Sequence, residues 1–187
     1  MFPDKVYLAS NSPRRLELLQ SAFKSVEKII STVEEPRWHE GEGAHHYLER
    51  CLEAKSRGAK GAFEAIKAPL SSEKTAKNLV VSADTIVVLN DEIFGKPESP
   101  EGAFQMLSRL MGKTHEVLTG YSLSLFESQK SGNKLLAEKS EILSTKVTFR
   151  KPSSKELWAY VKTGEPMDKS GSYGVQGPAL QFVQKVE

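Results

Sequence analysis

Short apolar runs alternate with stretches of helical spacing in the first third of the chain. Residues 6–9 form an apolar run that predicts a buried strand, and Ser12-Pro13 then supplies an N-cap and a first-turn proline for a helix. The apolar stripe of that helix comprises Leu16, Leu19 and Phe23. Residues 26–33 predict a second strand, and apolar positions three and four apart predict a longer helix over about residues 46–66.

The middle of the chain contains its most apolar segment. Residues 67–78 are polar and predict a surface loop that we expect to be mobile. Residues 79–89 predict a central strand, and Asn90-Asp91 predicts a hairpin turn into a short return strand. A helix is predicted from Ser99-Pro100 to Gly112. Its inner face comprises Ala103, Leu107, Leu110 and Met111.

The last third of the chain continues the alternation. Residues 115–126 and 140–149 predict two strands joined by a loop of Gly, Asn and Lys. Ser153 and Glu156 form the capping box of a further helix, and residues 179–186 predict a final strand. Strands that alternate with helices are typical of the α/β class.

Composition and charge narrow the class of protein. The 187 residues carry 26 Lys and Arg against 24 Asp and Glu, a net charge of +2, so we do not expect a nucleic-acid partner. No apolar run approaches the length of a membrane span, and the N-terminus lacks the pattern of a signal peptide. The single cysteine, Cys51, excludes an internal disulfide and favours a reducing, cytoplasmic compartment.

An arginine pair lies in the first turn of the first predicted helix. Residues 10–15 read Ser-Asn-Ser-Pro-Arg-Arg, and cations oppose the positive end of the helix dipole there. They become favourable if the turn binds an anion such as phosphate. The alternative is that Arg14 and Arg15 are solvated and pair with acids such as Glu17.

Two charged residues interrupt apolar patterns. Asp84 lies within the central strand, where a carboxylate becomes a candidate metal ligand or general base, or is satisfied by backbone N–H groups at a bend. Lys55 falls on the apolar face of the helix at about 46–66. It either needs an anionic partner or extends its ammonium group to water.

Two further motifs are weaker. In Gly95-Lys96-Pro97, a turn directs a lysine that suits phosphate. Glu34 and Glu35 follow a predicted strand and could hold Mg²⁺, or form a solvated acidic loop. Together, carboxylates, lysines and an arginine-bearing helix terminus favour phosphoryl or nucleotidyl chemistry, in which positioning and charge neutralisation dominate.

Motifs occur in order over nearly the whole chain. The first is LASNSPRRLELL at residues 8–19, and the central one joins SADT at 82–85 with GKP at 95–97. The later motifs are GKTH at 112–115 and EPMDKSGSYGVQG at 165–177. In sequence and order these motifs resemble those of the Maf family of nucleoside triphosphate pyrophosphatases. The resemblance implies a mixed twisted sheet with flanking helices, in two lobes around a cleft, similar to inosine triphosphate pyrophosphatases.

The resemblance also implies an activity and a partner set. Family members hydrolyse nucleoside triphosphates between the α- and β-phosphates with a divalent metal such as Mg²⁺ or Mn²⁺. The dTTP/UTP-preferring branch matches best, a homodimer is a further expectation, and no membrane is expected. The different-class alternative is a nucleotide- or nucleic-acid-binding protein without catalysis. We expect one Maf-like domain over residues 1–187, without the family's last strand and helix.

Residue roles follow from the same resemblance, motif by motif. Asp84 matches the proton acceptor, and Glu35 and Asp84 are the expected metal ligands. The expected catalytic residues are Asp84, Lys55 and Lys96. The expected substrate-binding residues are Ser10, Arg14, Thr85 and Gln176, of which Arg14, Thr85 and Gln176 match positions tied to substrate choice.

Overall fold

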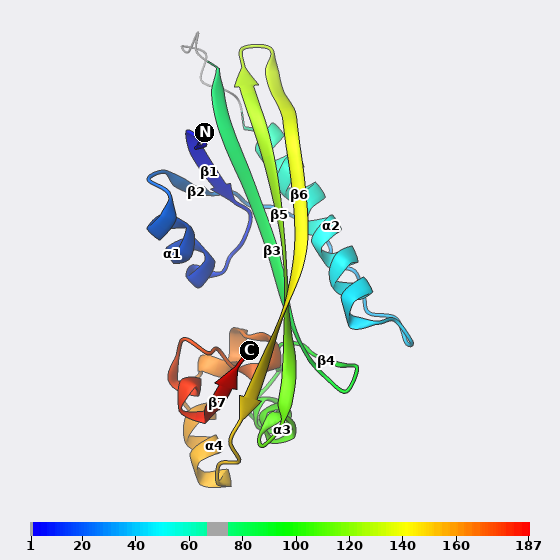
Figure 1. Ribbon diagram of the computed structural model, residues 1–187, viewed down its shortest axis with the longest axis vertical. Helices are drawn as coiled ribbons and strands as arrows, with labels where there is room; N and C mark the ends of the chain where they lie inside the picture. The colour runs from blue at the N-terminus through cyan, green and yellow to red at the C-terminus, as the bar shows by residue number, and fades with distance from the viewer. Residues whose placement is uncertain (1, 67–74) are drawn as a thin grey trace. The chain divides into compact units, whose positions relative to one another are not determined.

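The structure is a computed structural model that describes residues 2–66 and 75–187 (Figure 1). The helices are α1 (Pro13–Ala22), α2 (Ala44–Glu64), α3 (Pro100–Leu110) and α4 (Ser154–Val161). Three 3₁₀ helices follow: η1 (Glu165–Asp168), η2 (Ser170–Ser172) and η3 (Pro178–Phe182). The strands are β1 (Lys5–Leu8), β2 (Val26–Lys28), β3 (Ala76–Leu89), β4 (Glu92–Phe94), β5 (Thr114–Gln129), β6 (Gly132–Phe149) and β7 (Val183–Val186).

The strands form one mixed sheet, which confirms the predicted α/β class. Their order is β2-β1-β3-β5-β6-β7, and β4 pairs with β3 outside this path. β1 runs parallel to β2 and β3, whereas the β3–β4 and β6–β7 pairs are antiparallel. Within the described part of the chain, none of the helices is long and apolar enough to cross a membrane.

The chain divides into two compact units. Unit 1 comprises Met1–Glu40, Glu49–Asp84 and Gly120–Ile142, and unit 2 comprises Gly41–Leu48, Thr85–Thr119 and Leu143–Glu187. The boundary in β3 falls between Asp84 and Thr85, so one peptide bond separates a residue of unit 1 from a residue of unit 2.

Unit 1 has apolar clusters that join helices to strands. Leu16, Leu19 and Phe23 of the first helical segment pack against Val6 and Leu8, as the predicted stripe requires. A second cluster joins α2 to β1, β3 and β5. It contains Tyr7, Ala59, Phe63, Val80 and Phe126, with Phe63 between the two other rings.

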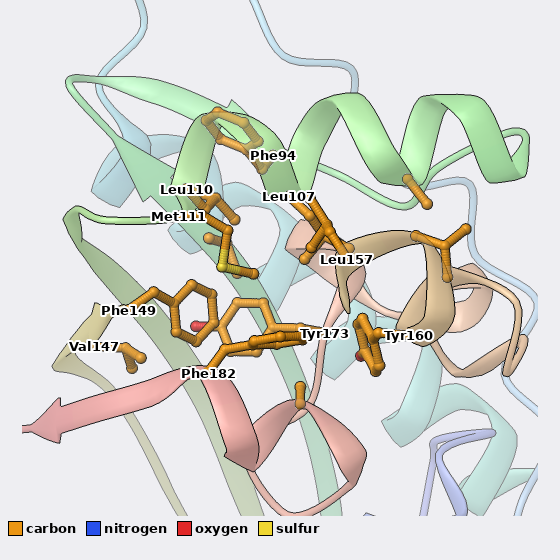
Figure 2. Close-up of a cluster of buried hydrophobic side chains, with 14 of the residues drawn as sticks. Phe94, Leu107, Leu110, Met111, Val147, Phe149, Leu157, Tyr160, Tyr173 and Phe182 are labelled. Atoms are coloured by element: carbon orange, nitrogen blue, oxygen red, sulfur yellow. The ribbon is translucent and has the colours of Figure 1, made fainter. Parts of the chain in front are cut away.

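Unit 2 has a larger core beneath α3 and α4 (Figure 2). The predicted inner face of α3 is buried, and the helix ends before Gly112, whose φ of +73° suits glycine. The predicted capping box of Ser153 and Glu156 is present at the start of α4. Asn90 and Asp91 both have positive φ, as a two-residue hairpin turn requires.

Several predicted bounds were wrong. β2 has three residues rather than the eight of 26–33, and β3 begins at Ala76, within the predicted loop 67–78. Residues 67–74 of that loop lie outside the described residues. β5 and β6 extend through most of the predicted loop between them. Most of β6 is exposed, so its polar sequence carries no apolar alternation to indicate a strand.

The predicted strand over 179–186 was also wrong in its first half. Pro178–Phe182 is the 3₁₀ helix η3, and only Val183–Val186 forms a strand. Proline at the first helical position fixes φ in the helical range. Ala179 and Phe182, three residues apart, are both fully buried, which is the spacing that one 3₁₀ turn places on one face.

Candidate active site

The turn before α1 is ordered by hydroxyl groups. The Ser12 hydroxyl accepts a hydrogen bond from the Arg15 backbone N–H at 3.5 Å, which confirms the predicted N-cap. The Ser10 hydroxyl accepts from the Ser12 N–H at 3.2 Å. The chain therefore leaves β1 and enters α1 through a turn stabilised by its own side chains.

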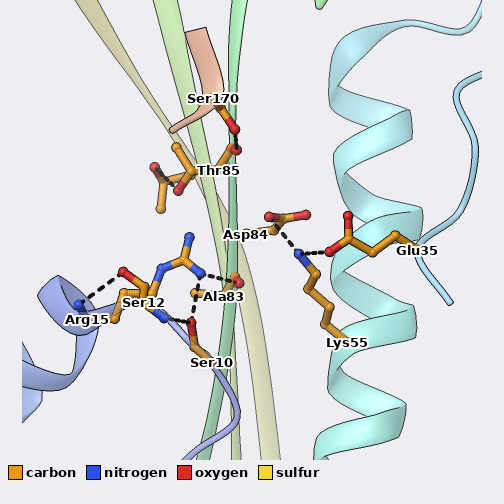
Figure 3. Close-up of polar contacts among 10 residues, drawn as sticks. Ser10, Ser12, Arg15, Glu35, Lys55, Ala83, Asp84, Thr85 and Ser170 are labelled. Carbon is orange, nitrogen blue, oxygen red and sulfur yellow. Dashed lines mark hydrogen bonds and ion pairs between the residues drawn. The ribbon is translucent and has the colours of Figure 1, made fainter. Parts of the chain in front are cut away.

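The two arginines of α1 differ in their surroundings. Arg14 is exposed, whereas Arg15 extends inward and donates from Nη1 to the Ala83 carbonyl at 2.8 Å and to the Ser10 hydroxyl at 3.3 Å (Figure 3). Burial lowers the pKa of Arg15, and the nearby charge of Asp84 opposes that shift. Arg15 thus links α1 to β3 one residue before Asp84.

Lys55 lies between two carboxylates of unit 1. Its ammonium nitrogen is 2.8 Å from Asp84 Oδ1 and 3.0 Å from Glu35 Oε1 (Figure 3). The side chains of Lys55 and Asp84 are 22% and 17% exposed, whereas that of Glu35 is 64% exposed. Burial alone would lower the pKa of Lys55, but the charges and hydrogen bonds of the carboxylates outweigh it and raise the pKa above its ordinary value.

This geometry decides between the alternatives left open for Lys55. The ammonium group binds two anions rather than extending to water alone, although its helix face is otherwise apolar. Glu35, expected either in a site or in a solvated loop, contributes one of those anions despite its exposure. Asp84, Lys55 and Glu35 therefore form one cluster from β3, α2 and the segment before α2.

Glu35 and Asp84 are the residues of the cluster that could hold a divalent cation. Glu35 and Asp84 are oxygen donors close enough to share one ammonium group. Mg²⁺ is commonly bound through one or two carboxylates, with phosphate oxygens and waters completing the shell. Among residues 2–66 and 75–187, no group of three or more His, Cys, Asp or Glu residues could hold a metal ion. A metal at Glu35 and Asp84 would accordingly take its remaining ligands from substrate and water.

Unit 2 contains the other predicted residues. The Thr85 hydroxyl lies 3.2 Å from the Thr119 hydroxyl, and the Thr85 carbonyl accepts from the Ser170 hydroxyl at 3.0 Å. The Gly171 N–H donates to the Gly95 carbonyl at 2.9 Å, next to the exposed Lys96. The segments around Thr85, Lys96 and Ser170 are therefore joined by direct hydrogen bonds.

Gln176 occupies an exposed turn beyond that junction. The turn is closed by a hydrogen bond from the Gly177 N–H to the Gly174 carbonyl at 3.1 Å. The residues before it, 171–174, are buried, and the hydroxyl of Tyr173 in this segment lies 2.6 Å from Nε2 of His115 in β5. Burial lowers the pKa of His115 to about 4 and raises the pKa of Tyr173. The uncharged pair therefore supports the turn from within the core.

Sequence reasoning missed several of these residues. Arg15 was noticed only as one of two helix-terminal cations, because sequence alone does not show which arginine extends inward. Thr119 carried no signal, since hydroxyl residues are common in strands. Membership in the later motifs was the available indication for Ser170 and for the buried pair of His115 and Tyr173.

An α/β fold that carries a carboxylate–lysine cluster, and arginines at the start of a helix, has the kinds of residue that bind phosphate groups. Comparison with known proteins gives the family: the Maf-like protein family matches residues 5–187. The chain belongs to the Maf family.

Curated relatives cover almost the whole chain. A dTTP/UTP pyrophosphatase of Escherichia coli O157:H7 is 39% identical over 182 residues, which are 97% of this chain and 81% of the relative. A dTTP/UTP pyrophosphatase of Photorhabdus laumondii is 40% identical over 181 residues, which are 96% of this chain and 81% of the relative.

A solved structure also matches. It is a nucleoside-triphosphatase / dITP/XTP pyrophosphatase from Mycobacterium abscessus, with a TM-score of 0.38 and 14% sequence identity. The match covers 78% of this chain and 74% of that chain.

Proposed function

We propose that this chain hydrolyses dTTP and UTP to the nucleoside monophosphate and pyrophosphate. Its family and the names of its curated relatives support this reaction. The observation that carries the proposal is the cluster of Lys55, Asp84 and Glu35, because cleavage of a phosphoanhydride needs both charge neutralisation and a group that accepts a proton.

In this proposal Asp84 orients the attacking water and accepts its proton. The second carboxylate, Glu35, contacts the same ammonium group. Lys55 and Lys96 neutralise the triphosphate and the departing pyrophosphate. Arg14 is exposed at the start of α1, where backbone N–H groups and the Ser10 hydroxyl also suit phosphate.

A divalent cation, Mg²⁺ or Mn²⁺, is part of the proposal. Glu35 and Asp84 would hold it. When bound, such an ion neutralises phosphate charge and acts as a Lewis acid. With both carboxylates on such an ion, the Lys55 ammonium group beside them would be able to bind phosphate oxygens.

Substrate choice is assigned to Arg14, Thr85 and Gln176, which match the family positions tied to dTTP and UTP. The Gln176 amide offers both a donor and an acceptor. Uracil and thymine present the same acceptor–donor–acceptor edge, so one arrangement serves both nucleotides. The single cysteine, Cys51, can form no disulfide within the chain, and this supports a reducing cytoplasm as the place of reaction. A homodimer is the assembly that we propose.

The test is direct. The protein is incubated with Mg²⁺ and each of dTTP, UTP, CTP and GTP, and pyrophosphate and monophosphate are measured together. We expect pyrophosphate and monophosphate to be released in equal amounts, and fastest from dTTP and UTP. A chelator of divalent cations should abolish the release. Nucleotide binding without release would contradict the proposal and favour a binding protein, and release of orthophosphate would contradict the assigned bond.

A further inference from the structure

Glu165 has a buried carboxylate oxygen with no donor. Its Oε2 atom is buried and has no hydrogen-bond partner among the residues that the structure describes. The backbone around it is held firmly: the Glu165 N–H donates to the Thr163 hydroxyl at 3.2 Å, and its carbonyl accepts from Lys169 Nζ at 2.7 Å. A buried acceptor without a donor is costly, so such an atom calls for a partner.

The carboxylate lies against the turn that carries Gln176. A Cβ atom placed on Gly177 would overlap Glu165 Oε1 and lie 3.0 Å from Oε2. The turn and the carboxylate are therefore in close contact, and a larger residue at position 177 would require the Glu165 side chain to move. Gly177 also closes the turn by its hydrogen bond to the Gly174 carbonyl, so Glu165 contacts the turn at the residue that follows Gln176.

The chemistry of a carboxylate restricts its partner. An ionised carboxylate accepts hydrogen bonds and does not donate them, so its partner must be an N–H or O–H group. Uracil and thymine have one ring donor, the imide N3–H, between two carbonyl oxygens. Cytosine has a lone pair at N3, which a carboxylate would repel.

We propose that Glu165 is a further specificity-determining residue, which accepts the N3–H of uracil or thymine while the Gln176 amide donates to a neighbouring carbonyl oxygen. The inference rests on the proposed function and assigns the donor that the buried oxygen lacks. Cytosine is then disfavoured for two reasons: it lacks the N3–H hydrogen bond, and its N3 lone pair is repelled by the carboxylate.

The first test needs no variant. UTP is compared with 3-methyl-UTP, which keeps both carbonyl groups and loses only the N3 proton. We expect kcat/KM to be at least ~10-fold lower for the methylated nucleotide, since a hydrogen bond to a charged group is worth roughly 1.5–3 kcal/mol. Calorimetric binding of UMP and 3-methyl-UMP gives the same comparison if no turnover is found, which separates this inference from the proposed function.

The second test is Glu165→Gln, with Asp168→Asn as the matched control. Asp168 lies in the same 3₁₀ helix, and its exposed carboxylate pairs with Lys169. The amide that replaces the carboxylate offers both a donor and an acceptor, so the UTP/CTP ratio of kcat/KM should fall by about 10-fold in Glu165→Gln. The ratio should remain unchanged in Asp168→Asn.

Each outcome decides the matter. Equal use of UTP and 3-methyl-UTP by the unmodified protein would overturn the inference, whether or not Glu165→Gln folds. An equal fall of kcat/KM for UTP and CTP in Glu165→Gln would also overturn it, because that pattern belongs to a purely structural residue. Gln176→Ala is measured for comparison. A fall in the UTP/CTP ratio of kcat/KM in both variants supports the view that Glu165 and Gln176 contact the same base.

Discussion

The ammonium nitrogen of Lys55 is 2.8 Å from Asp84 Oδ1, and this contact joins the middle of α2 to β3 within unit 1. The pair is mostly buried, which makes its charges interact more strongly than charges on an open surface. The carboxylates raise the pKa of Lys55 against the effect of its burial, so the ammonium form is stabilised on an otherwise apolar helix face.

Asp84→Asn should remove turnover and retain the fold. Asparagine keeps the shape of the side chain but accepts no proton in the reaction and binds a divalent cation weakly. We expect kcat to fall by about 10²–10⁴-fold at saturating Mg²⁺, the usual contribution of general acid–base catalysis. Pyrophosphate release measures turnover, and the circular dichroism spectrum shows whether the fold is retained. A variant that keeps most of its rate would exclude Asp84 as the proton acceptor.

Lys55→Met should lower both activity and stability. Methionine keeps an apolar stem and deletes the charge, which leaves Asp84 without its ammonium partner. We expect kcat/KM to fall by about 10-fold or more and the free energy of unfolding to fall by roughly 1–3 kcal/mol, since hydrogen bonds to charged groups are the stronger ones. Kinetics with dTTP and urea unfolding measure these values.

Lys60→Met is the matched control for this prediction. Lys60 lies in the same helix and its ammonium nitrogen is 2.7 Å from Glu138 Oε1, away from Asp84. It should lose some stability and keep its kcat/KM. Equal kinetic effects of the two substitutions would mean that Lys55 acts only by holding α2 in place.

Gly171→Ala should destabilise unit 2. Gly171 has a φ of +67°, and a Cβ atom there would lie 2.7 Å from Val87 Cγ2. Positive φ and overpacking together should lower the free energy of unfolding by about 2–4 kcal/mol. In Gly61→Ala, no atom lies within 4 Å of the added Cβ, and helix propensity should stabilise the protein by roughly 0.5–1 kcal/mol. Urea unfolding should show a lower free energy of unfolding for Gly171→Ala and a higher one for Gly61→Ala.

His115 should make stability depend on pH. Burial lowers its folded-state pKa to about 4, while the unfolded chain has the ordinary value of 6.5. Between these values the unfolded state binds more protons, so the stabilising effect is complete above pH 6.5 and is lost as the pH falls toward 4. Between about pH 7 and about pH 4.5, protonation of this residue in the unfolded chain should lower the free energy of unfolding by about 2 kcal/mol.

His115→Gln isolates that contribution. Glutamine stays neutral at every pH and can still bond to the Tyr173 hydroxyl. The free energy of unfolding should therefore decline less steeply with acid in the variant than in the original protein, while all carboxylates contribute equally to both. Parallel curves would show that His115 titrates in the same range in the folded and unfolded chains.

Local chemistry was predictable from the sequence, and long-range pairing was not. The Asn90-Asp91 turn and the Ser153–Glu156 capping box depend on neighbouring residues, so their patterns sufficed. The family resemblance identified the candidate residues but not their contacts. The partners of Lys55, Glu35 and Asp84, lie 20 and 29 positions away in sequence. No periodic pattern encodes such a contact.

Exposure and competing turns explain the remaining errors. β6 is polar on both faces over most of its length, so pairing with β5 rather than burial makes it a strand. At the C-terminal end, Pro178 overrides the strand-like composition that follows it.

The single peptide bond between Asp84 and Thr85 restricts how this sequence can vary. Successive side chains of a strand alternate in direction, so an insertion or deletion of one residue beside this bond would reverse the facing of every strand residue on one side of it. Asp84 would then lose its approach to Lys55, or Thr85 its approach to Thr119. Insertions and deletions should therefore be tolerated in the turns between elements. Within β3 they should disrupt the site even when the inserted residue resembles its neighbours.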